Sequence, residues 1–241
     1  MQRPWIVVLV GSSLYTVALL ITTAIAGLAI LACGFLPLRT LLKFAKAWAF
    51  VQLFLLRTLC GLTYSVEGLL NIPSGAHVSA WKHSSTWETI AQMVIFPPQA
   101  WVLKRELLLL PIAGWATRLL GPIAINRAAG GTAVMQVVEQ GKQRLQSGLW
   151  VLVFPEGTRV AVGSTRRHGI SAALLAKEAG CLVIPVAHNA GAYWGRQALL
   201  KRPGNIRVVI GEPISTLGRE AREISDEIRE WIDRETARLG G

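Results

Sequence analysis

The distribution of hydrophobic and polar residues divides the chain into an uncharged N-terminal run, a run interrupted by cations, and a longer alternating part. Residues 4–38 contain no charged side chain. A helix needs about 20 apolar residues to cross a bilayer, so this run is long enough to span one, with break points expected at Gly27 and at 34–37. A cleaved signal peptide fits less well, because its apolar core is normally about 7 to 15 residues long.

The second run, residues 38–59, is typical of a helix lying at a membrane interface. Its cations alternate with leucines and aromatic residues, which suits a position among lipid headgroups. Arg39, Lys43 and Lys46 outweigh Arg3 and the amino terminus. The positive-inside rule therefore places everything after the first helix in the cytoplasm. A helical hairpin that enters the membrane without crossing it is the alternative.

From about Tyr64 onward, short apolar runs alternate with helical patterns. The alternation predicts an α/β fold, in which helices flank a mixed, largely parallel sheet, with an N-terminal membrane-associated helical pair in front. We divide the chain into membrane-anchoring helices at 1–62 and a catalytic domain at 63–241. Strands are expected at 77–81, 100–103, 123–125, 149–154, 181–186 and 205–210, and helices at 86–95, 105–120 (broken by Pro111), 131–146, 171–179 and 220–239.

Composition supports a membrane-bound, cytosol-facing protein. Hydrophobic residues make up 52% of the chain, and the formal net charge is +11. The segment from 218 to the end carries −2, so the rest carries +13. Such a protein suits an anionic bilayer or a phosphate-bearing substrate. Nucleic acid is disfavoured, because the cations are scattered and no zinc-finger spacing or arginine-rich arm occurs. The three cysteines form no Cys-x-x-Cys pair and are expected to be reduced.

The strongest candidate for chemistry is the segment 82–89, Lys-His-Ser-Ser-Thr-Trp-Glu-Thr. A histidine that meets a carboxylate makes a general base with an orienting partner. Residues five apart lie about 140° apart around a helix axis, so His83 and Glu88 meet only if His83 precedes the helix and Glu88 lies in its first turn. Ser85 and Glu88 also match a capping box, so the alternative is that Glu88 only caps the helix. His188 is a rival base without a nearby carboxylate in sequence, and we favour a structural or binding role for it.

Three strand-like runs are each followed by cations that suit a phosphate group. Arg159 follows one of them in the sequence Phe-Pro-Glu-Gly-Thr-Arg at 154–159, and Arg127 and Lys104 follow two others. Arginine suits bidentate phosphate contacts, and Gly157 permits a tight turn or the close approach of a ligand. The alternative is a surface β-turn with a salt bridge between Glu156 and Arg159.

Other features limit the remaining possibilities. The chain has no Gly-x-Ser-x-Gly, no phosphate-binding P-loop, no Gly-x-Gly-x-x-Gly and no zinc-spaced set of ligands. We therefore expect an enzyme without a metal or redox cofactor. Pro185 lies within an expected strand, which predicts an edge strand or a bulge. His77 is expected to be packed in a strand and His168 to be exposed.

Taken together, four motifs in order resemble the glycerolipid acyltransferase family, in particular its bacterial 1-acyl-sn-glycerol-3-phosphate acyltransferases. The resemblance covers about residues 64–213. Its blocks correspond to 82–89, 121–127, 154–159 and 183–186, and the Lys-Arg-Glu-Leu at 104–107 is also similar to these enzymes. Two features depart from the family pattern: Glu88 stands where aspartate is usual, and Arg-Arg-His-Gly at 166–169 replaces an aromatic-Lys-x-Gly.

The resemblance implies transfer of a fatty acyl group from acyl-CoA or acyl carrier protein to the sn-2 hydroxyl of 1-acyl-sn-glycerol 3-phosphate, giving phosphatidic acid at the cytoplasmic face of the cell inner membrane. His83 would be the base and Glu88 its partner. The implied substrate-binding residues are Lys104, Arg127, Glu156, Gly157, Thr158, Arg159 and Pro185. The alternatives are an acyltransferase for another lysolipid, such as lyso-ornithine lipid, and a non-catalytic membrane-surface protein. The oligomeric state does not follow from the sequence.

Overall fold

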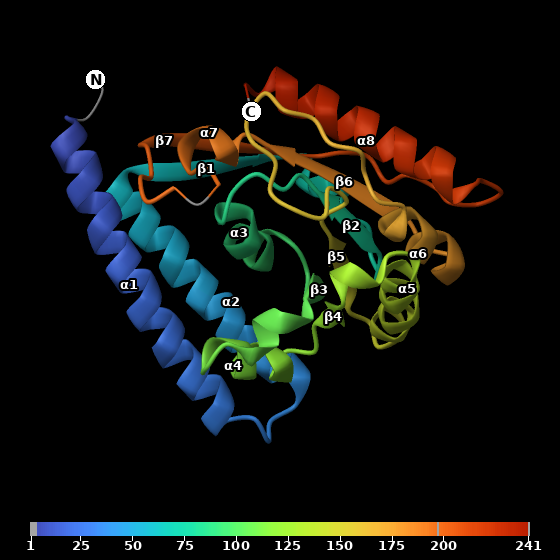
Figure 1. The fold of residues 1–241 in the computed structure, drawn as a ribbon, viewed down its shortest axis with the longest axis horizontal. Helices are drawn as coiled ribbons and strands as arrows, with labels where there is room; N and C mark the ends of the chain where they lie inside the picture. Colours follow the sequence, from blue (N-terminus) through green and yellow to red (C-terminus); the bar gives the residue numbers. More distant parts are fainter. Residues whose placement is uncertain (1–3, 197, 241) are drawn as a thin grey trace.

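The N-terminal helices form a pair along one side of the molecule. In the computed structural model, which describes residues 4–196 and 198–240, α1 (Trp5–Ala32) and α2 (Leu38–Leu55) are joined by a short turn. The break expected at Gly27 is wrong, because α1 continues through it, while the turn at 34–37 is present. Among the described residues, α1 is the one helix long and apolar enough to cross a membrane. Figure 1 shows both helices running beside the rest of the fold.

The predicted sheet is confirmed as a mixed, largely parallel one. Its seven strands lie in the order β1-β7-β6-β2-β5-β3-β4, and only the β6–β7 pairing is antiparallel. The strands are β1 (Leu62–Glu67), β2 (Val78–Trp81), β3 (Gln99–Lys104), β4 (Ile123–Ile125), β5 (Trp150–Val153), β6 (Val183–His188) and β7 (Gly204–Ile210).

Helices cover both faces of this sheet, and each face has its own apolar core. One face is packed by α2 and α3 (Trp87–Ile95), with the buried indoles Trp81, Trp87 and Trp150. The opposite face is packed by α5 (Gly131–Gln146), α6 (Ser171–Ala179) and α8 (Ala221–Arg238). Two shorter helices, α4 (Ala113–Leu119) and α7 (Ala190–Tyr193), lie in the connections.

Local patterns placed most of these elements correctly, with three differences. The sequence pattern missed β1 and α7, and the single helix expected at 105–120 is a 3₁₀ turn (Arg105–Leu109) followed by α4. Of the two alternatives predicted from Pro185, an edge strand or a bulge, the edge position is wrong, because β6 is an interior strand. The facing segment contains one extra residue, as in a bulge: Gly211 donates to the Pro185 carbonyl, and Val183 pairs with Ile214 in an isolated bridge one residue out of the β6–β7 register. The division at 62/63 stays a prediction, although β1 begins at Leu62.

The direction of the strands determines where functional side chains gather. Strands β2, β3, β4, β5 and β6 run parallel to one another, so their carboxyl ends lie at the same edge of the sheet. Open α/β sheets bind ligands at that edge. The segments that begin at Lys82, after β2, and at Phe154, after β5, leave neighbouring strands there.

Candidate active site

The contact expected between His83 and Glu88 is present in the structure. His83 lies in the loop after β2, and its Nδ1 is 2.8 Å from Glu88 Oε1. Glu88 lies in the first turn of α3, and its side chain turns back toward the loop. The same Oε1 accepts hydrogen bonds from the backbone N–H groups of Ser84 (3.0 Å) and Ser85 (2.8 Å). Glu88 therefore holds the loop and the imidazole ring together.

Ser85 and Glu88 also make capping contacts, although the helix starts one residue later than expected. α3 begins at Trp87, whose N–H donates to Ser85 Oγ at 3.1 Å. Glu88 Oε1 accepts from the Ser85 N–H, as the glutamate of a capping box does, while Ser85 Oγ accepts from Trp87 in place of the Glu88 N–H. The two alternatives for Glu88 are thus compatible, because one carboxylate oxygen caps the helix start and receives the imidazole N–H.

The hydrogen bonds determine which nitrogen of His83 can accept a proton. An ionised carboxylate only accepts hydrogen bonds, so Nδ1 carries the hydrogen and Nε2 holds the lone pair. The ring stacks on Phe154, with centroids 4.0 Å apart and planes 18° apart. Burial by itself raises the pKa of Glu88, but the hydrogen bond from His83, the two nearby imidazoles and the Ser85 N–H outweigh it and lower that pKa. Glu88 is consequently an anion that orients the imidazole through Nδ1.

His188 is a buried neighbour of the His83–Glu88 pair and is not a competing base. Its side chain is fully buried, and its Nε2 donates to the Lys82 carbonyl at 2.9 Å. Its Nδ1 accepts from the Ala190 N–H, and Nε2 is 3.9 Å from Glu88 Oε2. Burial lowers the pKa of His188, which keeps the ring neutral despite the neighbouring carboxylate. The structural role favoured from the sequence agrees with this position.

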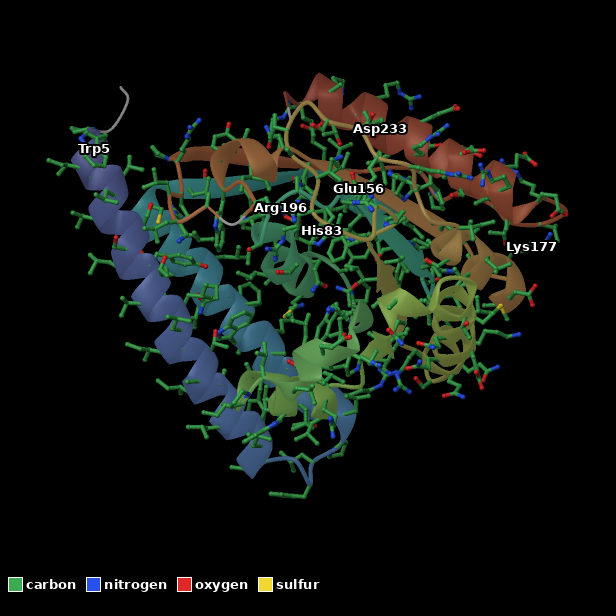
Figure 2. The ribbon with its side chains drawn as sticks, in the orientation of Figure 1. Trp5, His83, Glu156, Lys177, Arg196 and Asp233 are labelled. Carbon is green, nitrogen blue, oxygen red and sulfur yellow. The ribbon has the colours of Figure 1, made fainter. Side chains whose placement is uncertain are left out.

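Glu156 belongs to the scaffold of the loop that carries His83. Its Oε1 is 2.5 Å from Lys82 Nζ, and its Oε2 accepts from the His83 backbone N–H at 2.7 Å. The alternative salt bridge between Glu156 and Arg159 is therefore wrong. Burial raises the pKa of Glu156, and the Lys82 ammonium and the amide N–H offset only part of that effect. Figure 2 shows His83 and Glu156 next to each other in the centre of the molecule.

The turn that follows Glu156 requires its glycine for backbone reasons. Gly157 has φ 68°, a left-handed conformation, and a Cβ there would meet no atom within 4 Å. The Val160 N–H then donates to the His83 carbonyl at 2.8 Å. The Val160 N–H thus holds the His83 carbonyl, and the Glu156 carboxylate holds the His83 N–H. Both polar groups of the His83 backbone are therefore fixed.

The structure brings only some of the expected phosphate ligands to the same place. Arg159 is half-buried in the wall of a cavity beside Phe154. Lys104 is exposed at the end of β3, with Nζ 3.8 Å from Glu106. Arg127 lies in a 3₁₀ turn after β4, and its side chain is outside what the structure describes.

Two further expected ligands lie in different surroundings. Thr158 is half-buried in the turn between Glu156 and Arg159. Pro185 is buried in β6 and borders a different depression, beside Trp231 of α8, so it does not reach the cavity that Arg159 lines.

An apolar cavity of about 350 Å³ extends from Phe154, on which His83 stacks, toward the N-terminal helices. It is lined by side chains of α1, α2, α3, β3 and α4, and by Phe154 and Arg159. Gln92 is a polar group in its wall, and its Oε1 accepts from Trp101 Nε1 at 3.0 Å. Sequence reasoning missed this cavity, because its walls come from segments that are distant in the chain.

The two remaining histidines, His168 and His77, lie outside the His83–Glu88 pair. His168 is only 8% exposed, so the expectation that it is exposed is wrong. Burial and the nearby cations Lys82 and Arg229 lower its pKa to about 4. His77 lies just before β2, edge-on against Trp150. Within residues 4–196 and 198–240, no three His, Cys, Asp or Glu side chains are close enough to hold a metal ion.

Comparison with known proteins gives a consistent result. A family model described as "Acyltransferase" matches residues 63–189. A 1-acyl-sn-glycerol-3-phosphate acyltransferase of Pseudomonas aeruginosa is 41% identical over 208 residues, which are 85% of this chain and 81% of that one. A 1-acyl-sn-glycerol-3-phosphate acyltransferase alpha of Mus musculus is 31% identical over 164 residues, or 66% of this chain and 58% of the mouse protein.

A solved structure shares the whole architecture. The crystal structure of the 1-acyl-sn-glycerophosphate (LPA) acyltransferase PlsC from Thermotoga maritima has a TM-score of 0.78 to this chain. The match covers 95% of this chain and 94% of the Thermotoga protein, at 22% sequence identity. The likeness includes the N-terminal part of the chain as well as the sheet, and it shows a common fold.

Proposed function

This chain belongs to the acyltransferase family, and on that premise we propose that His83 Nε2 removes the proton from the sn-2 hydroxyl of 1-acyl-sn-glycerol 3-phosphate. The hydroxyl oxygen attacks the carbonyl carbon of an acyl thioester, and the carbon–sulfur bond then breaks. The imidazolium returns its proton to the departing thiolate. The products are phosphatidic acid, an intermediate of phospholipid biosynthesis, and a free thiol. The acceptor hydroxyl is the nucleophile, so the enzyme needs none of its own.

The observation that carries this proposal is the His83–Glu88 contact, whose imidazole stacks on Phe154 in the wall of an apolar cavity. Glu88 keeps the imidazole in the tautomer that accepts a proton at Nε2 and stabilises the imidazolium that forms, as the carboxylate does in a Ser-His-Asp triad. The cavity receives an acyl chain, because its wall is mostly apolar and it ends at Phe154, on which the base stacks. The donor is acyl-CoA or acyl carrier protein, used as a co-substrate without a cofactor.

The phosphate of the acceptor is bound by cations at the same edge of the sheet. Arg159 is the principal ligand, because it lies in the cavity wall and its Nε is buried without a hydrogen-bond partner among the described residues. Arg127 and Lys104 follow neighbouring strands and contribute charge. Gly157 lets the backbone approach the substrate. We assign Glu156 a positioning role, because both of its oxygens are already engaged.

The N-terminal helices associate the enzyme with the membrane, and we place them in one leaflet. Other parts of the chain pack on α1 near both of its ends: a Cβ at Gly11 would collide with the carbonyl of Leu59, just after α2, and one at Gly27 would lie 2.7 Å from Ile112 Cγ2. Between them, Lys201 Nζ donates to Thr16 Oγ1 at 2.6 Å. Lipid therefore does not surround α1 along its length, which favours the hairpin alternative.

The side of the membrane follows from charge. Arg39, Lys43 and Lys46 lie at the start of α2, directly after the apolar helix. Such cations stay on the cytoplasmic side and are attracted to anionic lipids. The proposed location is the cytoplasmic face of the inner membrane, where both a soluble thioester and a membrane-embedded lysolipid are within reach.

The test is a histidine substitution assayed with lysophosphatidic acid and an acyl-CoA, read as free thiol release. We expect His83→Ala to lower turnover by about 10² to 10⁴, the contribution of a positioned base. His77→Asn, at the opposite end of β2, is the matched control and should remain active. Near-normal turnover of His83→Ala would refute the role of the base. Equal turnover of an acceptor that lacks the phosphate would indicate that the natural acceptor is another lysolipid.

A further inference from the structure

The segment that leads from β3 into the first turn of α4 exposes an apolar surface that the reaction itself does not require. Leu109 is 69% exposed, Leu110 is 52% exposed and Trp115 is 51% exposed. None of the three lines the cavity. Monomeric soluble proteins rarely leave several large apolar side chains exposed in one short stretch, and such patches usually mark a binding surface. We call residues 107–115 the leucine segment.

The leucine segment is continuous with the apolar face of α1. α4 packs directly on α1, and Ile112 lies against Gly27 of that helix. On its outer side α1 exposes Leu20, Ile21, Ile25 and Leu28, each more than half exposed. The proposed membrane face of the N-terminal helices therefore extends across the helix boundary onto the leucine segment.

The charges beside the leucine segment suit an anionic bilayer. Within residues 104–118, Lys104, Arg105 and Arg118 are exposed cations, and Glu106 is the sole acidic residue. Cations at the headgroup level with leucine and tryptophan below them are the arrangement found in interfacial membrane elements. A protein partner would need neither this continuity with α1 nor this distribution of charge.

The leucine segment also forms part of the cavity wall. Leu107 and Ala113 line the cavity on one side, and Thr23, Gly27 and Ile30 of α1 line it on another. Ile112, between them, has φ 59°, a conformation that is strained for a β-branched residue. The wall that separates the cavity from the exposed apolar surface is therefore this one short segment.

We propose that the leucine segment is a third membrane-inserted element, beside α1 and α2, and that the lysolipid passes from the bilayer into the cavity between this segment and α1. The inference rests on the proposed function, because it assigns an entry side to the acceptor of that reaction. It makes the enzyme depend on Leu109 and Leu110 only when the acceptor is delivered from a membrane.

The experiment compares two ways of presenting the acceptor. The Leu109→Glu/Leu110→Glu double variant and wild type are reconstituted in phosphatidylethanolamine–phosphatidylglycerol vesicles. Each is assayed with a long-chain lysophosphatidic acid held in the vesicles and with a short-chain one that is monomeric in water. We expect the double variant to lose at least tenfold in kcat/KM with the vesicle-held acceptor and to be unchanged with the soluble one. Leu217→Glu is the control, because Leu217 is 90% exposed and borders the same depression as Lys177, on the side away from α1 (Figure 2).

A second measurement does not depend on activity. Brominated phospholipids quench tryptophans that enter the bilayer, so Trp115→Phe should lower the quenched fraction of the fluorescence relative to wild type. Equal losses with both acceptors, no loss with either, or quenching that is the same with and without Trp115 would each overturn the inference. A wild-type enzyme inactive with every lysolipid would instead refute the proposed function, and the quenching experiment would still test the membrane contact.

Discussion

Replacing Glu88 by glutamine changes the charge of the candidate pair and little else. The amide oxygen can still accept from His83 Nδ1, Ser84 N and Ser85 N, which all converge on Oε1. The imidazolium that forms in the transition state, however, loses its counter-ion. For charge centres about 4 Å apart and an effective dielectric constant of about 20, that attraction is about 4 kcal/mol. Since about 1.4 kcal/mol corresponds to a factor of ten in rate, we expect kcat/KM to fall by about 10³.

The assay is thiol release with saturating donor and varied lysophosphatidic acid. The loss should appear in kcat with little change in KM, because Glu88 is fully buried on the Nδ1 side of the ring, away from the Nε2 that meets the acceptor. Glu139→Gln makes the same chemical change on the exposed surface of α5 and should be neutral. Glu88→Asp keeps the charge with a shorter arm and should fall between wild type and Glu88→Gln.

Stability gives a second readout of the same substitution. The folded pKa of Glu88 lies below its ordinary value, so the carboxylate stabilises the fold above its unfolded pKa, and this contribution is lost as the pH falls through the folded value. Glu88→Gln should lack that part of the acid destabilisation. A Glu88→Gln enzyme within about tenfold of wild-type kcat/KM, with an unchanged pH–rate profile, would refute the argument that the charge supports the base.

Three further substitutions test other parts of the site. Arg159→Ala should mainly raise the KM for lysophosphatidic acid, and an unchanged KM would count against its phosphate contact. Glu156→Gln leaves the ammonium of Lys82 buried without its counter-ion, so the free energy of unfolding should fall by about 3 kcal/mol, which thermal melts would check. The backbone of His83 also loses a hydrogen-bond acceptor, so kcat in the thiol-release assay should fall. The pKa of His168 is lowered to about 4, whereas a histidine in the unfolded chain has a pKa of about 6.5. As the pH falls, the unfolded chain therefore binds this proton before the folded chain does, and the free energy of unfolding declines between about pH 6.5 and 4, by up to about 3 kcal/mol. His168→Asn should lessen that decline in melts across this pH range, and identical curves would contradict the assignment.

The parts of the fold that local signals specify were predictable from the sequence. The bounds predicted for β4, α5 and α6 agree with the structure. For α6 the reason is visible at its end, where Gly180 has φ 63°, the left-handed conformation that ends a helix. The meeting of His83 and Glu88 could also be anticipated, because the five-residue spacing permits it when His83 precedes the helix and Glu88 lies in the first turn, although a Glu88 that only caps the helix was the alternative.

Features that depend on distant partners were not predictable in this way. β1 has no clear sequence signal, because it is a half-exposed edge strand whose partner, β7, begins at Gly204. The polar sequence around His168 suggests a solvated loop, yet tertiary packing buries it. The pairing of Lys82 with Glu156 joins residues 74 positions apart. No local periodicity contains such information.

The pairing of the first strand with the last has a consequence for the order in which the protein is made. Leu62 of β1 lies opposite Gly204 of β7, and β7 is the sole sheet neighbour of β1 within the described residues. At about 5 to 20 residues per second, the ribosome needs roughly 7 to 30 s to reach the partner once β1 has been synthesised. During that interval the backbone edge of β1 is unpaired, while α1 and α2 are already complete. Early binding of these helices to the bilayer would cover their apolar surface and prevent aggregation of the chain until β7 pairs with β1.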